Sequence, residues 1–133
     1  MNISRRHEPL KTQHTEMQGI FITGTDTGVG KTLVAGALSA AARRSGARVG
    51  VFKPCESGCA GPDGSFHAHD AAFLQRMSGS SAPLEHICPY RLREALAPAV
   101  AAEREHVSIS PLFIGEVFRK LCADCDAIIV EGA

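Results

Sequence analysis

The sequence of 133 residues lacks a net charge, because fourteen lysines and arginines balance fourteen aspartates and glutamates. A chain with no excess positive charge offers no electrostatic footprint for nucleic acid or an anionic membrane. The sequence also lacks an apolar run of membrane-spanning length, and no apolar segment follows Arg5 and Arg6 as a secretory signal requires. These absences predict a cytoplasmic protein with neither nucleic-acid nor membrane partners.

Cysteine is scarce, and its count of five is odd. Without an export signal, an odd number of cysteines predicts reduced thiols in the cytosol. Cys122 and Cys125 have C-x-x-C spacing, but no second pair of ligands follows for zinc, and no thioredoxin-like sequence surrounds them. We therefore expect these two cysteines, together with Cys55 and Cys59, to serve packing rather than metal or redox chemistry.

The most informative stretch runs from Gly19 to Thr32 and reads GIFITGTDTGVGKT. A short apolar run leads into a glycine-rich turn that ends at Gly30 and Lys31, and an alanine-rich run follows. Strand, glycine-rich loop, Lys-Thr and helix form the arrangement of a P-loop. Glycines let backbone N–H groups turn toward an anion, and the helix N-terminus adds the positive end of its dipole. Lys31 can reach terminal phosphates and Thr32 can ligate Mg²⁺, which predicts a nucleotide site.

The spacing of this loop departs from the usual motif at one position. Thr25 stands five residues before Gly30, where a glycine is usual, while Gly24 lies one residue further back and Gly28 lies inside the loop. An ordinary glycine-rich turn between a strand and a helix is the alternative interpretation. The flanking strand and helix patterns favour the nucleotide-binding loop.

Apolar periodicity predicts an α/β fold of the P-loop class, with a mostly parallel sheet flanked by helices. A strand, a helix and a second strand in succession predict a right-handed parallel βαβ unit. Residues 87–92 read as a short extended segment. The expected strands are 20–22, 49–52 and 127–130, and the expected helices are 31–44, 67–77 and one that opens at Ser110-Pro111.

Residues 1–17 show no periodicity, so we expect a flexible extension there, followed by the nucleotide-binding domain over 18–133. Three strands are few for such a sheet, and the chain ends directly after the last of them. We therefore expect the fold to be incomplete at its C-terminus and this chain to be the amino-terminal portion of a longer protein.

Polar residues follow the expected strands at the edge where α/β sheets bind ligands. Lys53 comes directly after one strand and Glu131 ends another, so both should face the crevice beside the glycine-rich loop. A fixed cation there suits an anionic substrate, and a carboxylate suits Mg²⁺. Asp70, near a helix start, is either a second metal ligand or an acid favoured by the helix dipole. Each of these residues also has a purely structural interpretation. Lys53 would be a solvated lysine, Glu131 a solvated strand end, and Ser57 part of a simple turn.

These segments, in this order, resemble the dethiobiotin synthetase family. GTDTGVGKT (24–32) is similar to the longer-spaced P-loop of that family, which accounts for Thr25. KPCESG (53–58), HDAAFLQR around Asp70, PYRLREALAPAVAA (89–102) and the final EGA are similar to further segments of it. The first match alone is shared with related P-loop proteins, whereas several in order are specific. Ala99 departs from the family, because many members carry a histidine there, and any substrate contact from that side chain is absent.

The resemblance implies an ATP- and Mg²⁺-dependent ligase of biotin biosynthesis, which joins CO₂ to 7,8-diaminononanoate (7,8-diaminopelargonate) and closes the ring to dethiobiotin. It implies catalysis by Lys31 and Lys53 and a diamine contact from Ser57. It also implies a homodimer when full length, with the fragment alone inactive because adenine recognition lies in the missing half. The implied metal ligands are Thr32, Asp70 and Glu131. The implied nucleotide-binding residues are Gly28, Val29, Gly30, Lys31, Thr32, Leu33, Asp70, Glu131, Gly132 and Ala133.

Two other functions stay open on the sequence. One is a partitioning or regulatory P-loop ATPase that binds partners according to its nucleotide state. Such proteins carry an additional lysine early in the loop, where this chain has Thr25, Asp26 and Thr27. The other is a cobyrinate-type amide synthase of the same class, against which the KPCESG segment favours dethiobiotin synthesis.

Overall fold

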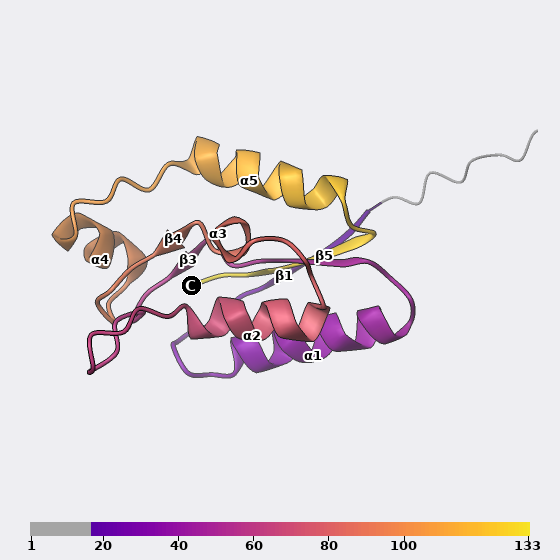
Figure 1. Cartoon of the computed structure of the whole chain (residues 1–133), viewed down its shortest axis with the longest axis horizontal. Helices are drawn as coiled ribbons and strands as arrows, with labels where there is room; N and C mark the ends of the chain where they lie inside the picture. The colour runs from indigo at the N-terminus through magenta and orange to yellow at the C-terminus, as the bar shows by residue number, and fades with distance from the viewer. Residues whose placement is uncertain (1–16) are drawn as a thin grey trace, which may run out of the picture.

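The chain forms a parallel sheet with helices on both faces (Figure 1). A computed structural model describes residues 17–133. The expected α/β fold is confirmed, whereas the expected extension lies outside the described residues apart from Met17. The elements are β1 (Gln18–Ile22), α1 (Lys31–Arg44), β2 (Val49–Phe52), β3 (Cys55–Glu56), α2 (His69–Ser78), α3 (Leu84–Ile87), β4 (Tyr90–Arg91), α4 (Pro98–Arg104), α5 (Pro111–Ala123) and β5 (Ala127–Glu131).

The main sheet has the strand order β1-β5-β2, and both pairings are parallel. The strands joined by α1 are therefore parallel, as expected, but β5 lies between them. Ile128 and Ile129, which point to opposite faces of β5, are 1% and 3% exposed. A continuous apolar run of this kind is typical of a strand covered on both faces, which is the environment of a central strand.

The register of the sheet brings the ends of its strands level with one another. Ile22 of β1 pairs with Glu131 of β5, and Phe52 of β2 pairs with Val130. Lys53 follows Phe52 directly, so it lies level with Glu131. The glycine-rich loop leaves β1 at the same edge. The sheet therefore delivers a loop, a cation and an acid to one place.

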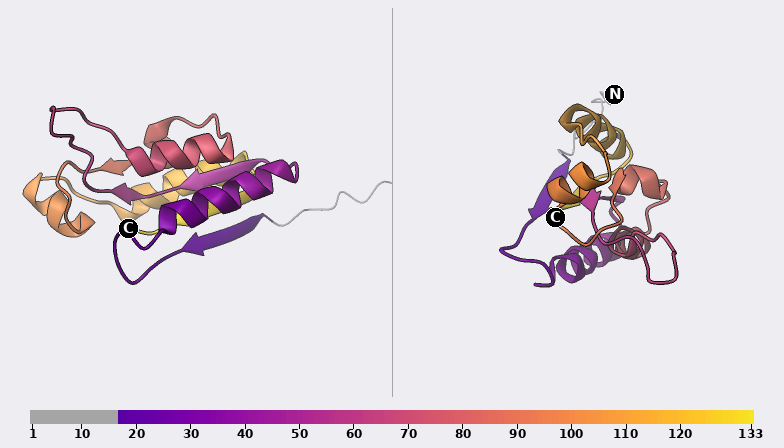
Figure 2. Two further views of the ribbon diagram at one scale, coloured as in Figure 1. Left: turned by 90° about the horizontal axis from the view of Figure 1, so that it is seen from below. Right: turned by 90° about the vertical axis from the view of Figure 1, so that its left-hand side faces the viewer.

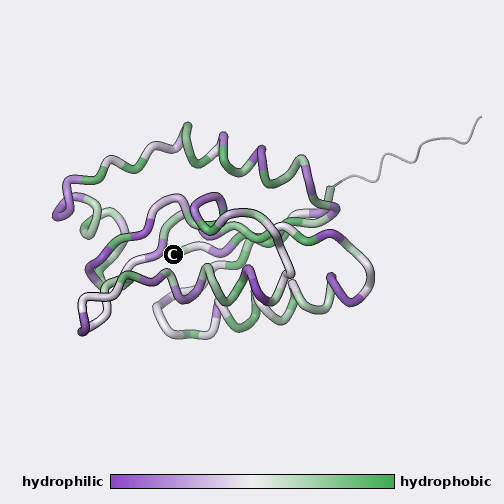
Figure 3. Tube along the Cα trace, viewed as in Figure 1, coloured by the Kyte–Doolittle hydropathy of each residue, from purple (hydrophilic) through white to green (hydrophobic). Residues whose placement is uncertain are grey.

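Helices α1 and α2 cover one face of the sheet, and α5 covers the other (Figures 1 and 2). Ala35 and Leu74 are fully buried on the first face, and Val117 packs with Phe52 on the second. The trace of α5 alternates between hydrophobic and hydrophilic residues (Figure 3), as an amphipathic helix on a sheet should. Burial of each large apolar side chain stabilises this arrangement by roughly 1.5–3 kcal/mol.

The segment between α2 and α5 differs from the sequence-based expectation. Residues 84–87 form a single helical turn, and only Tyr90 and Arg91 are extended, where they pair in parallel with β3. A short apolar run does not distinguish a turn of helix from a strand, and its tertiary contacts decide. Pro98 is the first residue of α4, a position that suits proline because the N–H it lacks would be unpaired in a first turn.

Strand β1 is much less covered than the other two strands of the main sheet. Ile20 is 48% exposed and Phe21 is 65% exposed, and within residues 17–133 no strand pairs with the outer edge of β1. Of the helices that the structure describes, none has the length and apolar character needed to cross a membrane.

Candidate active site

A cavity of about 320 Å³ lies at the carboxyl ends of the three main strands. Its walls come from the glycine-rich loop, the start of α1, the segment after β2, the start of α2 and the end of β5. The lining residues are Thr27, Gly28, Gly30, Lys31, Thr32, Lys53, Cys55, Glu56, Ser57, Asp70, Glu131 and Ala133. Nine of the residues that the sequence singles out for function are in this set, so the tertiary fold brings them together.

The glycine-rich loop adopts a backbone that only some residues tolerate. Gly28 has φ 73° and Gly30, which caps the N-terminus of α1, has φ 95°, both in the left-handed region. A Cβ atom at Gly24 would lie 2.9 Å from Cγ2 of Val29 and 3.2 Å from the side chain of Lys31. This crowding explains why position 24 holds a glycine although the loop has Thr25 at the usual glycine position.

The side chain of Lys31 folds back over the loop. Its Nζ donates a hydrogen bond to the carbonyl oxygen of Asp26 at 2.7 Å. This hydrogen bond holds the ammonium against the loop, and Lys31 lines the cavity together with Gly28 and Gly30.

Glu131 is the most deeply buried charged residue of the site, with 1% of its surface exposed. Its Oε1 accepts a hydrogen bond from the hydroxyl of Thr32 at 2.7 Å and another from Nζ of Lys53 at 2.9 Å. Its Oε2 is buried and accepts no hydrogen bond from any described residue. A buried carboxylate oxygen without a donor is costly, so the site has one unfilled position for a cation or a donor.

Lys53 is a second buried charge, and only 5% of its side chain is exposed. Besides the ion pair with Glu131, its Nζ lies 3.4 Å from Oδ2 of Asp70. Burial alone would lower the pKa of Lys53. The hydrogen bond that its ammonium donates to Glu131 and the negative charges of Glu131, Asp70 and Glu56 outweigh burial, so the pKa is raised. Lys53 is therefore a permanent cation at neutral pH rather than a base or a nucleophile.

The KPCESG segment (53–58) runs along the cavity because β3 and β4 hold it there. The backbone N–H of Leu92 donates to the carbonyl of Glu56 at 2.8 Å, and the N–H of Gly58 donates to Glu94 at 3.0 Å. Gly58 has φ 76°, which turns the chain away after Ser57. Residues 89–102, which resemble a segment of the family, thus have a structural role, because hydrogen bonds from this stretch hold residues 53–58 in place.

Three cavity residues were missed by the sequence analysis: Thr27, Cys55 and Glu56. Burial raises the pKa of the Cys55 thiol, and the nearby charge of Lys53 only partly opposes this, so the thiol stays neutral. Glu56 accepts two backbone hydrogen bonds from the start of α2. Ala68 cannot cap the helix with its own side chain, so the N–H groups of the first turn need an acceptor from elsewhere. This is the one sequence signal that could have indicated a role for Glu56.

Three residues that the sequence implicates lie apart from the cavity wall. Val29 and Leu33 are 55% and 68% exposed, and neither lines the cavity, nor does Gly132. Any contact from these three to a nucleotide would come from their backbone. The N–H of Gly132 is already used, because it donates to the carbonyl of Ile22 at 2.9 Å.

The side chains present fit a hard divalent cation. Thr32, Asp70 and Glu131 offer oxygen ligands around one cavity, and the free Oε2 of Glu131 points to a missing positive partner. Among residues 17–133, no three acids, histidines or cysteines cluster closely enough to form a complete metal cage. Mg²⁺ usually binds through one or two carboxylates plus water and phosphate oxygens, so a cage is not required for it.

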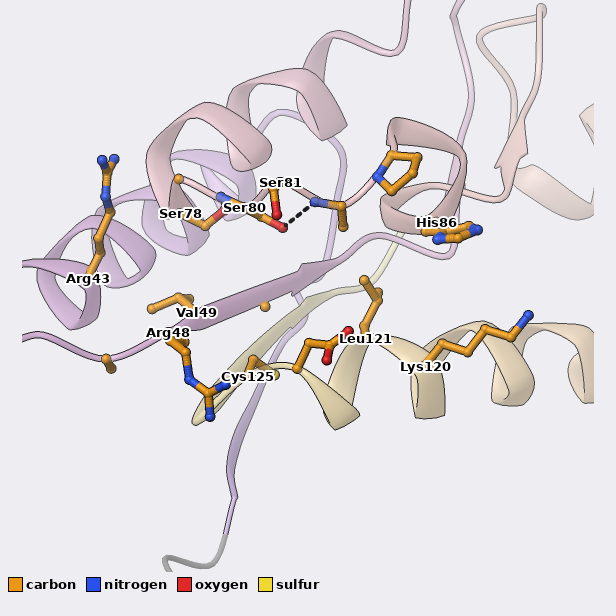
Figure 4. A pocket seen from close by; sticks show the side chains of 16 residues that line it. Arg43, Arg48, Val49, Ser78, Ser80, Ser81, His86, Lys120, Leu121 and Cys125 are labelled. Atoms are coloured by element: carbon orange, nitrogen blue, oxygen red, sulfur yellow. Dashed lines mark hydrogen bonds between the residues drawn. The ribbon is translucent and has the colours of Figure 1, made fainter.

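A larger cleft of about 630 Å³ lies at the opposite end of the strands, where β2 begins and where α1, α2 and α5 end (Figure 4). It is lined by basic residues, but Arg43, Arg48 and Lys120 do not converge on one point. Arg48 is paired with Asp126 at 2.6 Å. Three helix C-termini place negative dipole ends here, which disfavours an anionic ligand. The smaller cavity is therefore the candidate active site.

The sequence of this chain is similar to those of known proteins. An ATP-dependent dethiobiotin synthetase of Anaeromyxobacter dehalogenans (strain 2CP-C) is 47% identical over 117 residues, which are 88% of this chain and 51% of that protein. One of Bacillus cereus (strain G9842) is 41% identical over 119 residues, which are 88% of this chain and 47% of that protein. The chain thus spans about half the length of the curated relatives it matches. The resemblance to dethiobiotin synthetases expected from the motifs is confirmed.

A protein family described as AAA domain matches residues 18–133. The matched region contains the glycine-rich loop, the supporting sheet and every lining residue of the candidate active site. With so much of the chain matched, and with a P-loop at the carboxyl edge of a parallel sheet, the chain belongs to the AAA-domain family.

Proposed function

We propose that this chain is the phosphate- and carbamate-binding part of an ATP-dependent dethiobiotin synthetase, a ligase of biotin biosynthesis. In the proposed reaction, one amine of 7,8-diaminononanoate takes up CO₂ and loses a proton to form a carbamate. A carbamate oxygen then attacks the γ-phosphorus of ATP, and ADP leaves. The second amine attacks the resulting mixed anhydride at carbon, loses a proton and expels phosphate, which closes the ring. ATP creates the electrophile, so no serine or cysteine nucleophile is needed.

The observation that carries the proposal is the ion pair of Lys53 and Glu131 in the same cavity as the glycine-rich loop. A loop of this kind alone would serve many phosphate-binding proteins. A buried lysine beside it, kept charged by its neighbours, supplies what an anionic carbamate requires during attack on a phosphate. Lys53 accordingly holds the carbamate and offsets negative charge as the phosphoryl group transfers.

The phosphates of ATP lie in the loop in this proposal. The backbone N–H groups of 28–33 face the phosphate oxygens, and the N-terminus of α1 adds its dipole. Lys31 exchanges its hydrogen bond with Asp26 for one with the terminal phosphates. Phosphoryl transfer depends on positioning and charge neutralisation, so two lysines that line one cavity are suited to it.

Thr32, Asp70 and Glu131 line the same cavity and would hold Mg²⁺ there. The bound ion would neutralise phosphate charge and fix the geometry of the transfer. Thr32 donates its hydroxyl hydrogen to Glu131, and the lone pairs of the same oxygen stay available to ligate the metal. Ser57 faces the cavity near Lys53 and is the proposed contact for the diamine.

The test is product formation by the full-length protein. Incubation with 7,8-diaminononanoate, bicarbonate, Mg²⁺ and ATP should yield dethiobiotin, ADP and phosphate in equal amounts, detected by mass spectrometry and a coupled phosphate assay. Omission of the diamine should stop ATP consumption. ATP hydrolysis at the same rate with and without diamine would instead indicate the regulatory ATPase.

We further propose that the full-length protein acts as a homodimer in the cytoplasm. This rests on the resemblance, and the neutral composition is compatible with it. Light scattering of the full-length protein should give twice the mass of one chain, and a monomeric mass would reject the dimer.

A further inference from the structure

Helix α2 begins at the candidate active site without a capping residue of its own. Its first residue is His69, and the preceding residue, Ala68, has no side-chain oxygen to accept a hydrogen bond. The carboxylate of Glu56 takes that place from another element. Its Oε1 accepts from the N–H of Asp70 and its Oε2 from the N–H of Ala71, both at 2.9 Å. Glu56 is thus a remote N-cap, fourteen residues before Asp70 in the chain.

The environment of Glu56 suits anchoring and not contact with a substrate. The residue is 6% exposed, and both carboxylate oxygens are engaged by backbone N–H groups. Its backbone is fixed in β3, which pairs with β4 through the register of Glu56 with Arg91. A carboxylate that accepts two N–H groups at a helix N-terminus is favoured by charge-assisted hydrogen bonds and by the helix dipole.

Asp70 depends on this anchor for its position. The residue lies in the first turn of α2, and its side chain is 45% exposed. Oδ2 of Asp70 lies 3.4 Å from Nζ of Lys53, a separation too long for a strong hydrogen bond. First turns of helices fray when their N–H groups lack acceptors. Glu56 accepts the backbone N–H of Asp70 itself, so the cap and the Asp70 carboxylate belong to the same first turn.

We propose that Glu56 is a positioning residue, which ties the first turn of α2 to the KPCESG segment and so holds Asp70 toward the metal position. This inference rests on the proposed function in one respect, namely that Asp70 serves a Mg²⁺–ATP complex. Although Glu56 lines the cavity, both of its carboxylate oxygens are engaged by backbone N–H groups, so in this proposal it acts through Asp70. It links the carbamate-binding side of the site, at Lys53, to the metal-binding side.

Amide hydrogen exchange measures the anchor directly in the full-length protein. Glu56→Gln keeps the size of the side chain but replaces one acceptor with an NH₂ group that cannot accept from a backbone N–H. Exchange at Asp70 and Ala71 should accelerate about five- to tenfold in this variant. Glu105→Gln is the matched control, because Glu105 also accepts two backbone N–H groups, from Arg93 and Glu94. It should leave exchange at the start of α2 unchanged.

The affinity for Mn²⁺ of the ATP complex, measured by electron paramagnetic resonance, tests whether Glu56 acts through Asp70. Glu56→Gln should weaken Mn²⁺ binding about five- to tenfold. In an Asp70→Asn background the same change should have no further effect, because the ligand it positions is gone. Equal loss in both backgrounds would overturn the proposal and assign Glu56 to general stability. Glu56→Asp, which cannot span both N–H groups, provides a second variant with a carboxylate if Glu56→Gln fails to fold.

The two proposals fail separately. Failure of the unmodified full-length protein to form dethiobiotin would reject the proposed function, while amide exchange and Mn²⁺ affinity would still report on Glu56. Normal amide protection at Asp70 and Ala71 in Glu56→Gln, in a protein that makes dethiobiotin, would overturn the anchor alone.

Discussion

The ammonium of Lys53 lies 2.9 Å from Oε1 of Glu131, although 78 residues separate them in the chain. Both side chains are buried, and the parallel register of β2 with β5 sets them level. A buried ion pair is costly to desolvate and adds little to stability against an apolar pair of the same shape. The presence of this pair in the cavity beside the glycine-rich loop therefore favours a role in chemistry over a role in stability.

Loss of the Lys53 charge should affect turnover and stability together. In the full-length protein, Lys53→Met should reduce kcat about 10²- to 10³-fold, because the cation that offsets developing charge is gone. It should also lower the free energy of unfolding by about 3–5 kcal/mol, since Glu131 is left buried without its partner. Steady-state kinetics and chemical denaturation measure the two effects. Lys120→Met, an exposed lysine on α5, is the control and should change neither.

The variant Lys53→Met/Glu131→Gln separates the two contributions. Removal of both charges should restore most of the lost stability while turnover stays low. A Lys53→Met enzyme with a normal rate would remove the carbamate role from this residue.

The hydroxyl of Thr32 should matter for the metal and not for folding of the loop. Thr32→Val has the same shape but no oxygen, and it should raise the Mg²⁺ concentration for half-maximal activity by at least about tenfold. Thr32→Ser keeps the oxygen and should stay within about threefold of the parent. Titration of activity with Mg²⁺ at fixed ATP gives both values. Equal Mg²⁺ dependence in the two variants would argue against Thr32 as a ligand.

Alanine substitutions at two helical glycines should change the stability of the protein in opposite directions. A Cβ atom at Gly36 would overlap the ring of Phe73, because α1 and α2 cross closely there, so Gly36→Ala should destabilise the protein by about 1–3 kcal/mol. A Cβ atom at Gly115 in α5 meets nothing within 4 Å. Gly115→Ala should stabilise by about 0.5–1 kcal/mol, since alanine loses less entropy in a helix. Thermal unfolding of both variants tests the pair, and equal signs would contradict the described helix crossing.

The ion pair of Arg48 with Asp126 should make stability fall in acid. The hydrogen bond from the Arg48 side chain holds the pKa of Asp126 below its ordinary value of 3.8. A lowered folded pKa means that this contribution is complete above the ordinary value and disappears as the pH drops through the folded value. The melting temperature of Asp126→Asn should therefore be lower than that of the parent at pH 7. The gap should close as the pH falls below about 4.

The same ion pair is exposed, so its effect should be small and should shrink in 1 M salt. A gap between parent and Asp126→Asn that widens in acid would contradict the assignment.

Much of the chain was predictable from local pattern. The helix from Lys31 to Arg44 begins and ends where the sequence analysis placed it, because a glycine precedes it, alanines fill it and arginines close its last turn. The helix opened by Ser110 was equally predictable, since the Ser110 hydroxyl accepts from the N–H of Phe113 as an N-cap does. Such signals act within a few residues, and no distant contact competes with them.

Other features had no local signal. The start of α2 shifts from residue 67 to His69, because the acceptor for its first N–H groups is Glu56, in a different element. Strands β3 and β4 have two residues each and exist only by pairing with one another. A pattern of apolar residues does not reveal such a partner.

By itself, the sequence determined the glycine-rich loop, its flanking strand and helix, and the polar residue types that end each strand. These depend on backbone freedom, capping and side-chain chemistry within a few positions. Only the tertiary structure decided that β5 lies between β1 and β2, that Glu131 is shared by Thr32 and Lys53, and that Glu56 caps α2. Strand order and buried charge pairs depend on which apolar surfaces pack against one another and exclude water. Those surfaces come from residues distant in the chain, so no local pattern specifies them.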